Sequence, residues 1–546
     1  MPNLYPPELY YLNNFRTALA WLVERYADLL TEEEQAFISG FAALAWQAQA
    51  LLVRMIMRRG CHFRLSKLDY AEIGDCLAAA EPLLENGWVT EQAPLTAVEV
   101  AELLRKDELL AHLPLTDIRS NRKKSELLDQ LLAQDLPAQP FSAWCPALND
   151  RLLSLQVDEL CNRLRLMFYG NLAQHWSEYV LADLGIYRYE SVDISPESRG
   201  FRTRQDIEDY LHLRELRVRF EEGEAPEAVL PPLLAFASDN PYLTGRQSRQ
   251  LFHLARQLER GGDLQQALAV YQRSDYPEAR WRQIRVLEQL GCFADAHAQA
   301  LAFSAMPKSD EEAQRLERAL IRLQRKLGLP VARRSRAVQA PRIDLRLPPP
   351  GHGSVEVAVR DHLHTDDAPV HYVENTLLCS LFGLLCWEAI FAPLPGAFFH
   401  PFHSGPVDLY SPDFYPRRRA LFDACLSRLQ QPDYPERILQ RYREKAGIQS
   451  PFVVWALLDE SLLELALQCI PAQHLQACFV RLLQDIKANR AGMPDLIQFY
   501  PHQQRYRMIE VKGPGDRLQD NQKRWLAFAA EQGIAVDVCY VSWASA

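Results

Sequence analysis

The chain has 546 residues, a formal net charge of −10, and 48% hydrophobic and 24% charged residues, which is typical of a globular protein with about three or four domains. No run approaches the roughly 18 apolar residues of a membrane span, and the start lacks the features of a secretory signal, so we expect a cytoplasmic protein without a membrane partner. The 11 cysteines include no Cys-x-x-Cys pair, which argues against a zinc finger and against a disulfide framework.

The N-terminal third predicts two units. Residues 1–90 have helical periodicity and predict an N-terminal helical region. Residues 91–135 predict two short helices, Pro94–Leu104 and a second one that begins near Asn121. A basic cluster lies at the start of the second helix and consists of Arg119, Arg122, Lys123 and Lys124. Charge runs are usually solvated faces, but basic residues at a helix N-terminus suit a phosphate backbone, and two short helices with a basic turn resemble a SAP DNA-binding module.

The middle of the chain predicts a helical scaffold. In residues 136–330, the pattern Leu258 … Gly262 … Ala267 returns about one helical hairpin later, at a spacing shorter than the roughly 34 residues of a tetratricopeptide repeat. This echo favours a tetratricopeptide-like array of helical hairpins that spaces the DNA module from the C-terminal region. The prolines and arginines of residues 331–353 predict a linker.

Residues 354–546 predict an α/β domain. Asp495–Tyr500 and Arg505–Lys512 predict two strands joined by a turn, followed by a helix and a final strand. Because side chains alternate along a strand, Glu510 and Lys512 share one face, and the hairpin can bring Asp495 beside them. The order strand, strand, helix, strand is that of a mixed α/β core.

These three side chains predict phosphodiester hydrolysis. Asp495 and Glu510 supply hard oxygen ligands that suit Mg²⁺ or Mn²⁺, which activates a water for attack on phosphorus. Lys512 can contact the phosphate oxygens where charge develops in the transition state. An isolated Glu-x-Lys is usually a pair of surface charges, but here Gly-Met-Pro-Asp495 precedes it, as in metal-dependent nucleases of the PD-(D/E)xK kind.

The same segment carries a family resemblance. Asn489–Leu496 and Glu510–Trp525 resemble the virus-type replication-repair nuclease (VRR-NUC) domain, and within that group the bacterial Fanconi-associated nucleases. Phe168–Gly185 and Leu381–Phe391 resemble the central region of that family and the stretch before its nuclease core. The resemblance covers most of residues 90–546. It implies a restriction-endonuclease-like C-terminal domain after mainly α-helical N-terminal and central regions, with a SAP module where the basic cluster lies.

The resemblance also implies further site residues. The family has an additional acidic ligand on an upstream helix, and Glu374 matches it better than Glu388, with Glu356 third. The implied metal ligands are then Glu374, Asp495, Glu510 and Val511, with Glu374 also catalytic. Gln522 resembles an accessory polar residue of the site, although a helix-capping role fits it nearly as well.

The implied function is a structure-specific DNA nuclease that cuts 5′ flaps and branched DNA, acts as a 5′-end-directed exonuclease, and takes part in interstrand-crosslink repair at the nucleoid. Two alternatives stay open: a VRR-NUC nuclease for other branched DNA such as Holliday junctions, and a non-catalytic helical adaptor. No ubiquitin-binding zinc finger is expected, and the oligomeric state is left open.

Overall fold

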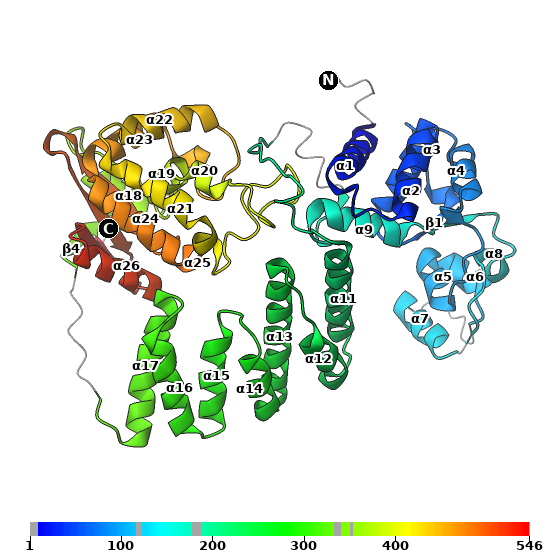
Figure 1. The fold of residues 1–546 in the computed structure, drawn as a ribbon, viewed down its shortest axis with the longest axis horizontal. Coiled ribbons are helices and arrows are strands. Elements are labelled where there is room, and N and C mark those ends of the chain that lie inside the picture. The colour runs from blue at the N-terminus through cyan, green and yellow to red at the C-terminus, as the bar shows by residue number, and fades with distance from the viewer. Residues whose placement is uncertain are drawn as a thin grey trace. The chain divides into compact units, whose positions relative to one another are not determined.

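The computed structural model (Figure 1) describes residues 9–115, 123–134, 136–176, 187–331, 340–349 and 353–544. By their internal contacts these residues form two compact units. Unit 1 consists of Met1–Tyr187 and Phe201–Ile207, and unit 2 of Arg188–Gly200 and Glu208–Ala546. No helix within the described ranges is long and apolar enough to span a membrane.

Within its described residues, unit 1 is helical apart from one small sheet. Strand β3 (Leu152–Leu155) pairs antiparallel with β1 (His62–Arg64) and with β2 (Val89–Thr90). Residues 1–90 are mainly helical, as predicted, but they also contain β1 and β2, which the sequence did not indicate because strands of two or three residues leave no periodic pattern. The helices of unit 1 are α1 (Tyr10–Tyr26), α2 (Glu32–Ala43), α3 (Trp46–Ile56), α4 (Cys76–Glu85), α5 (Ala97–Leu103), α6 (Lys106–His112), α7 (Lys124–Leu132), α8 (Phe141–Trp144) and α9 (Asp158–Tyr169).

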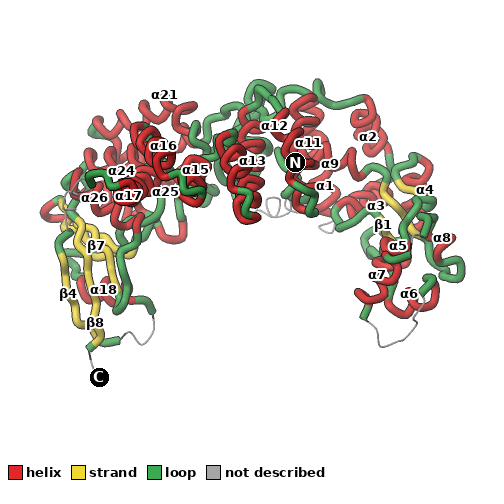
Figure 2. Tube along the Cα trace, turned by 90° about the horizontal axis from the view of Figure 1, so that it is seen from below, coloured by secondary structure: helices red, strands yellow, loops and turns green. Residues whose placement is uncertain are grey.

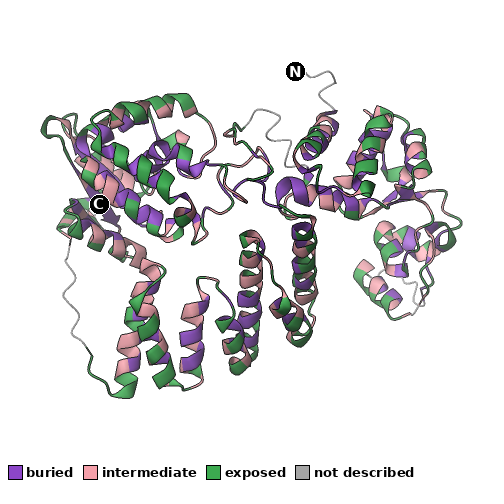
Figure 3. Cartoon of the chain, in the orientation of Figure 1, coloured by how far each residue is buried: buried purple, intermediate pink, exposed green. Residues whose placement is uncertain are grey.

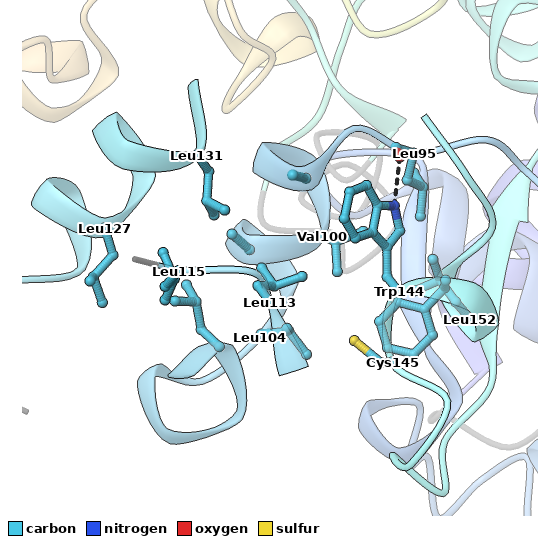
Figure 4. Packing of buried hydrophobic residues seen from close by; sticks show 14 residues of the cluster. Leu95, Val100, Leu104, Leu113, Leu115, Leu127, Leu131, Trp144, Cys145 and Leu152 are labelled. Carbon is cyan, nitrogen blue, oxygen red and sulfur yellow. Dashed lines mark hydrogen bonds between the residues drawn. The ribbon is translucent and has the colours of Figure 1, made fainter. Parts of the chain in front are cut away.

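The predicted SAP module has its own apolar core (Figure 4). Val100 of α5, Leu127 of α7 and Trp144 of α8 are buried in it, and Trp144 Nε1 donates a hydrogen bond to the carbonyl oxygen of Leu95 over 2.8 Å. Full burial of a leucine such as Leu127 stabilises the fold by roughly 2 kcal/mol. Both helices of the sequence interpretation exist, and their core extends beyond residue 135 to α8.

Unit 2 begins with an array of helical hairpins. Consecutive helices from α13 to α17 pack against one another. Helix α13 is buried along one face and exposed along the other, whereas α15 is buried along one face and only partly exposed along the other (Figure 3). Gly262 (φ +90°) caps the end of α13 and Gly291 (φ +77°) follows α15, so the repeated sequence pattern marks the ends of two alternate helices. The array consists of α11 (Arg204–Glu221), which begins in unit 1, α12 (Pro226–Ala235), α13 (Pro241–Gly261), α14 (Leu264–Gln272), α15 (Ala279–Gln289), α16 (Phe293–Ala305) and α17 (Asp310–Leu327).

The C-terminal domain is built on a mixed sheet, drawn in yellow with β4, β7 and β8 labelled in Figure 2. The sheet has five strands in the order β4-β8-β7-β6-β5. Strands β4, β8 and β7 run parallel, whereas β7, β6 and β5 are antiparallel. The predicted hairpin, helix and final strand are confirmed, and the second strand of the hairpin has the predicted bounds. The strands are β4 (Arg342–Leu347), β5 (Val370–Tyr372), β6 (Leu496–Tyr500), β7 (Arg505–Lys512) and β8 (Val536–Trp543).

Strand β4 corrects the predicted linker over residues 331–353. It pairs with β8 along its whole length, from Arg342 opposite Val538 to Leu347 opposite Trp543, and so forms one edge of the sheet. Its alternation of polar and apolar residues is typical of an edge strand, but the prolines beside it favoured a linker.

Helix α18 (Val355–Leu363) covers one face of the sheet. Val359 of α18 packs with Ile509 and Val511 of β7 in a buried cluster, so the side chains of Glu510 and Lys512 take the opposite face. The other helices of the domain are α19 (Leu377–Leu385), α20 (Trp387–Ile390), α21 (Phe414–Ser427), α22 (Tyr434–Lys445), α23 (Glu460–Cys469), α24 (Ala472–Gln484), α25 (Ile486–Asn489) and α26 (Asp520–Glu531).

Polar contacts join the helical array to this domain within unit 2. Arg318 of α17 forms a bidentate ion pair with Asp520 of α26, with N–O distances of 2.6 and 2.8 Å. Arg481 of α24 pairs with Asp310 at the start of α17 over 2.8 Å, and its guanidinium lies over the ring of Trp525. The last helix of the array therefore contacts the helix that follows the catalytic hairpin.

Candidate active site

The hairpin β6–β7 places the three predicted catalytic side chains at one end of the sheet. Leu496 pairs with Ile509, so Asp495, just before β6, lies beside the end of β7. Its Oδ2 accepts a hydrogen bond from the backbone N–H of Val511 over 2.7 Å. Its own carbonyl oxygen accepts one from the N–H of Val373 over 2.9 Å, which extends the pairing of β5. Asp495 is thus fixed by strands on both sides.

Glu510 and Lys512 project from the same face of β7 and form an ion pair. Lys512 Nζ lies 2.7 Å from Glu510 Oε1. The exposed fractions of Asp495, Glu510 and Lys512 are 7%, 1% and 7%, so two acids and one base share a largely dry environment. Charges are rarely buried in this way unless they are compensated.

The site carries more negative potential than Lys512 can neutralise. Burial raises the pKa of Asp495 to about 6; the N–H of Val511 opposes this rise, and the Glu374 carboxylate adds to it. Burial also raises the pKa of Glu510 to about 7; the carboxylate of Asp495 adds to this rise, and Lys512 opposes it. Two desolvated carboxylates that resist ionisation fit a site that gains a divalent cation through hard oxygen ligands. The donor set therefore fits the metal that the sequence implied.

Glu374 lies near this pair, but not on a helix as the sequence interpretation had it. It lies in the turn between β5 and α19, and its charge contributes to the raised pKa values of Asp495 and Glu510. The hydroxyl of Tyr372 donates to one carboxylate oxygen of Glu374, and Asn375 Nδ2 donates to the other over 3.3 Å. Among the described residues, no three acidic, histidine or cysteine side chains lie close enough to hold an ion by themselves.

The two competitors of Glu374 differ in their positions. Glu388 pairs with Arg441 at the surface and is not among the main groups that shift the pKa of Asp495. Glu356 lies in the first turn of α18, and its charge also raises the pKa of Asp495. Glu356, the third candidate of the sequence interpretation, is therefore near enough to influence the site.

The structure also places Val511, the fourth implied ligand, and Gln522, the implied accessory residue. Val511 packs its side chain into the core under α18, so only its backbone can face the site. Gln522 is the third residue of α26, and its Oε1 accepts from the N–H of Gln519 over 2.8 Å in a capping box. The structure thus gives Gln522 the helix-capping role, which was the alternative for this residue.

Only part of the basic cluster is described. Arg119 and Arg122 lie outside the described residues. Lys123 is exposed at the start of α7, whereas Lys124 Nζ donates to the carbonyl oxygen of Leu104 over 2.8 Å and to that of Glu102 over 3.2 Å. Lys124 therefore binds the C-terminal end of α5, whereas Lys123 is exposed to solvent, where it can contact DNA.

Sequence reasoning missed Tyr372 and Asn375. Both flank Glu374, and Asn375 has φ +55°, a left-handed conformation that asparagine adopts more readily than most residues. The sequence signal for Asn375 was its position directly after the candidate acid Glu374.

Comparison with known proteins assigns the chain to a family. A family model for the "FAN1, HTH domain" matches residues 9–90, one for the "Fanconi anemia-associated nuclease SAP domain" matches residues 94–144, and one for the "VRR-NUC domain" matches residues 430–543. A Pseudomonas aeruginosa protein described as a Fanconi-associated nuclease 1 homolog is 54% identical over 539 residues, which are 98% of this chain and 96% of that protein. The chain belongs to the Fanconi-associated nuclease family.

More distant relatives and solved structures agree. An Arabidopsis thaliana homolog of the family is 23% identical over 605 residues, which are 99% of this chain and 68% of that protein. The crystal structure described as paFAN1 bound to 2nt 5′flap DNA with gap superposes with a TM-score of 0.88 at 54% identity, covering 99% of this chain and all of that one. The family assignment confirms a DNA nuclease with a VRR-NUC domain, of a superfamily that generally uses divalent metal ions.

Proposed function

We propose that this nuclease cuts 5′ flaps and related branched DNA, with 5′-end-directed exonuclease action, and that it acts in interstrand-crosslink repair on the nucleoid in the cytoplasm. The observation that carries the proposal is the near-complete match, in sequence and in fold, to a protein solved with a 5′ flap. The buried pair Asp495 and Glu510 supports the chemistry.

The metal that we propose is Mg²⁺ or Mn²⁺, which Asp495, Glu510 and Glu374 would hold with the backbone of Val511. Because the acids do not hold an ion by themselves, waters or phosphate oxygens of the DNA would complete the ligand set. Such an ion would supply Lewis-acid activation of water and would neutralise phosphate charge. A bound cation would also offset the burial, and the repulsion between carboxylates, that together raise the pKa values of Asp495 and Glu510.

The residues of the chain perform the remaining tasks. The N–H of Val511 fixes one oxygen of Asp495 and so orients the carboxylate. Lys512 holds a positive charge 2.7 Å from Glu510, where it can stabilise the negative charge that builds on the phosphate oxygens during attack. Because the site is nearly dry, this charge acts in a low dielectric and is worth more than it would be in water.

The test is cleavage of end-labelled 5′-flap, 3′-flap, Holliday-junction and plain duplex DNA with Mg²⁺, Mn²⁺ or EDTA, using wild type beside Asp495→Ala. We expect metal-dependent cutting of the 5′ flap that the variant loses. Equal cutting of every substrate would refute the flap preference, and preference for the junction would favour the alternative substrate class. The third candidate, a non-catalytic adaptor, is disfavoured because both acids and Lys512 are present in one buried cluster.

A further inference from the structure

Glu374 differs from the other candidate ligands in its surroundings. Asp495 and Glu510 are buried and belong to the hairpin, whereas Glu374 is exposed and lies in a turn that joins a three-residue strand to α19. An exposed glutamate has several rotamers, and ordering its side chain has an entropic cost. A ligand in this position needs partners that hold it.

Two donors supply that restraint, one on each carboxylate oxygen. The hydroxyl of Tyr372 contacts Oε2, and Tyr372 itself is fixed by the pairing of β5, where it lies opposite Leu496. Asn375 Nδ2 contacts Oε1 over 3.3 Å. Donors on both oxygens restrict rotation of the carboxylate about its last bond.

Asn375 also reaches the loop that carries Asp495. Its Oδ1 accepts a hydrogen bond from the backbone N–H of Met493 over 3.1 Å, two residues before Asp495. One amide group therefore joins the carboxylate of Glu374 to the Gly-Met-Pro-Asp segment. A change in either segment is transmitted to the other through this side chain.

The backbone of Asn375 is adapted to this bridge. Asn375 and Gln504 are the two non-glycine residues with positive φ among the described residues. Left-handed backbone is unfavourable for most side chains and often occurs where the surrounding structure requires it. Glycine would adopt φ +55° without strain but would lack the amide, so asparagine serves both conformation and bonding.

We propose that Asn375 and Tyr372 are positioning residues that hold Glu374 in register with Asp495 and thereby set the affinity of the site for its divalent cation. This inference rests on the proposed metal-dependent function. Partners that orient metal-ligating carboxylates typically change metal affinity or activity by about 10- to 100-fold when they are removed.

The experiment uses the full chain with Asn375→Gly and Tyr372→Phe. Asn375→Gly keeps the backbone conformation and removes the amide, and Tyr372→Phe keeps the ring and removes the hydroxyl. The first readout is Mn²⁺ binding to DNA-free protein by calorimetry, and the second is the Mn²⁺ concentration that gives half-maximal cleavage. We expect the dissociation constant for Mn²⁺ and the half-maximal Mn²⁺ concentration to rise about 10-fold in either variant. Cleavage should be restored at saturating Mn²⁺.

Gln504→Gly is the matched control for the backbone change. Gln504 has φ +46° and is exposed in the turn at the opposite end of the β6–β7 hairpin. We expect its Mn²⁺ affinity to equal that of wild type. An equal loss in Gln504→Gly and Asn375→Gly would overturn the proposal, because it would trace the effect to the glycine.

A second background tests whether Asn375 acts through Glu374. In Glu374→Ala, Asn375→Gly should cause no further loss of Mn²⁺ affinity, since the carboxylate that it positions is gone. An additional loss in that background, or unchanged affinity in both single variants, would overturn the proposal. Failure of the proposed function would look different, because wild type itself would then neither bind Mn²⁺ nor cut DNA.

Discussion

Asp495→Asn should stabilise the metal-free protein at alkaline pH while it abolishes cleavage. Burial raises the pKa of Asp495 to about 6 from an ordinary value of 3.8, so the native state holds its proton more tightly than the unfolded state does. Between these two values the unfolded state ionises first, and the free energy of unfolding falls as the pH rises. Below about pH 4 both states are protonated, and this effect disappears.

The size of the effect follows from the pKa difference. A rise of about 2 units, at 1.36 kcal/mol each, corresponds to about 3 kcal/mol of stability lost by wild type above pH 6. Asparagine does not ionise, and its Oδ1 can still accept the hydrogen bond from the N–H of Val511. The variant should also relieve Glu510, whose pKa is raised in part by the charge of Asp495.

The assay is thermal unfolding of wild type and Asp495→Asn in EDTA at pH 4 and at pH 8. We expect similar midpoints at pH 4 and a midpoint higher by on the order of 5 to 10 °C for the variant at pH 8. Addition of Mn²⁺ at pH 8 should stabilise wild type and leave the variant nearly unchanged. Equal midpoints of the two metal-free proteins at pH 8 would refute the reasoning, because they would mean that the buried carboxylate carries no desolvation cost.

Three further predictions concern other parts of the chain. Lys512→Ala should reduce the single-turnover rate of cleavage at least about 100-fold and retain DNA affinity, since it removes charge stabilisation in the transition state. A cleavage rate within about tenfold of wild type would count against that role. Gly492→Ala should lower both the melting temperature and cleavage, because φ is +89° and the new Cβ would lie 2.8 Å from a side chain of α26. Gly515→Ala is the control: φ is +91°, but the new Cβ would meet no atom within 4 Å, so this variant should show the milder backbone effect alone. Lys123→Ala should weaken DNA binding and reduce its salt dependence by about one phosphate contact, without loss of stability. Lys124→Ala should also lower the melting temperature, because it removes the hydrogen bonds from Lys124 to the end of α5. A lower melting temperature in Lys123→Ala but not in Lys124→Ala would contradict these contacts.

The sequence predicted the catalytic hairpin well because its signals are local. Strand alternation placed Glu510 and Lys512 on one face, and the turn between the strands fixed their register with Asp495. The helical array was also predictable, because each helix has an apolar stripe and a glycine marks several helix ends.

The rest depends on contacts between distant residues. Strand β4 pairs with β8, which lies almost 200 residues later in the chain, and no local pattern specifies that partner. The turn position of Glu374 depends on the left-handed backbone of Asn375. Likewise, the use of Lys124 as a cap for α5 and the raised pKa of Asp495 follow from burial and packing, which alternation alone does not determine.

The position of β4 determines where a fragment that contains the complete nuclease domain has to begin. The VRR-NUC match starts at residue 430, but a fragment cut there would lose β4, α18 and β5, and Glu374 with them. It would keep Asp495, Glu510 and Lys512 on a sheet whose β6 and β8 edges are both bare. Open strand edges of this kind attract other chains, so such a fragment should aggregate rather than act as a small nuclease. A catalytic fragment suited to crystallisation or fusion therefore has to start before Arg342.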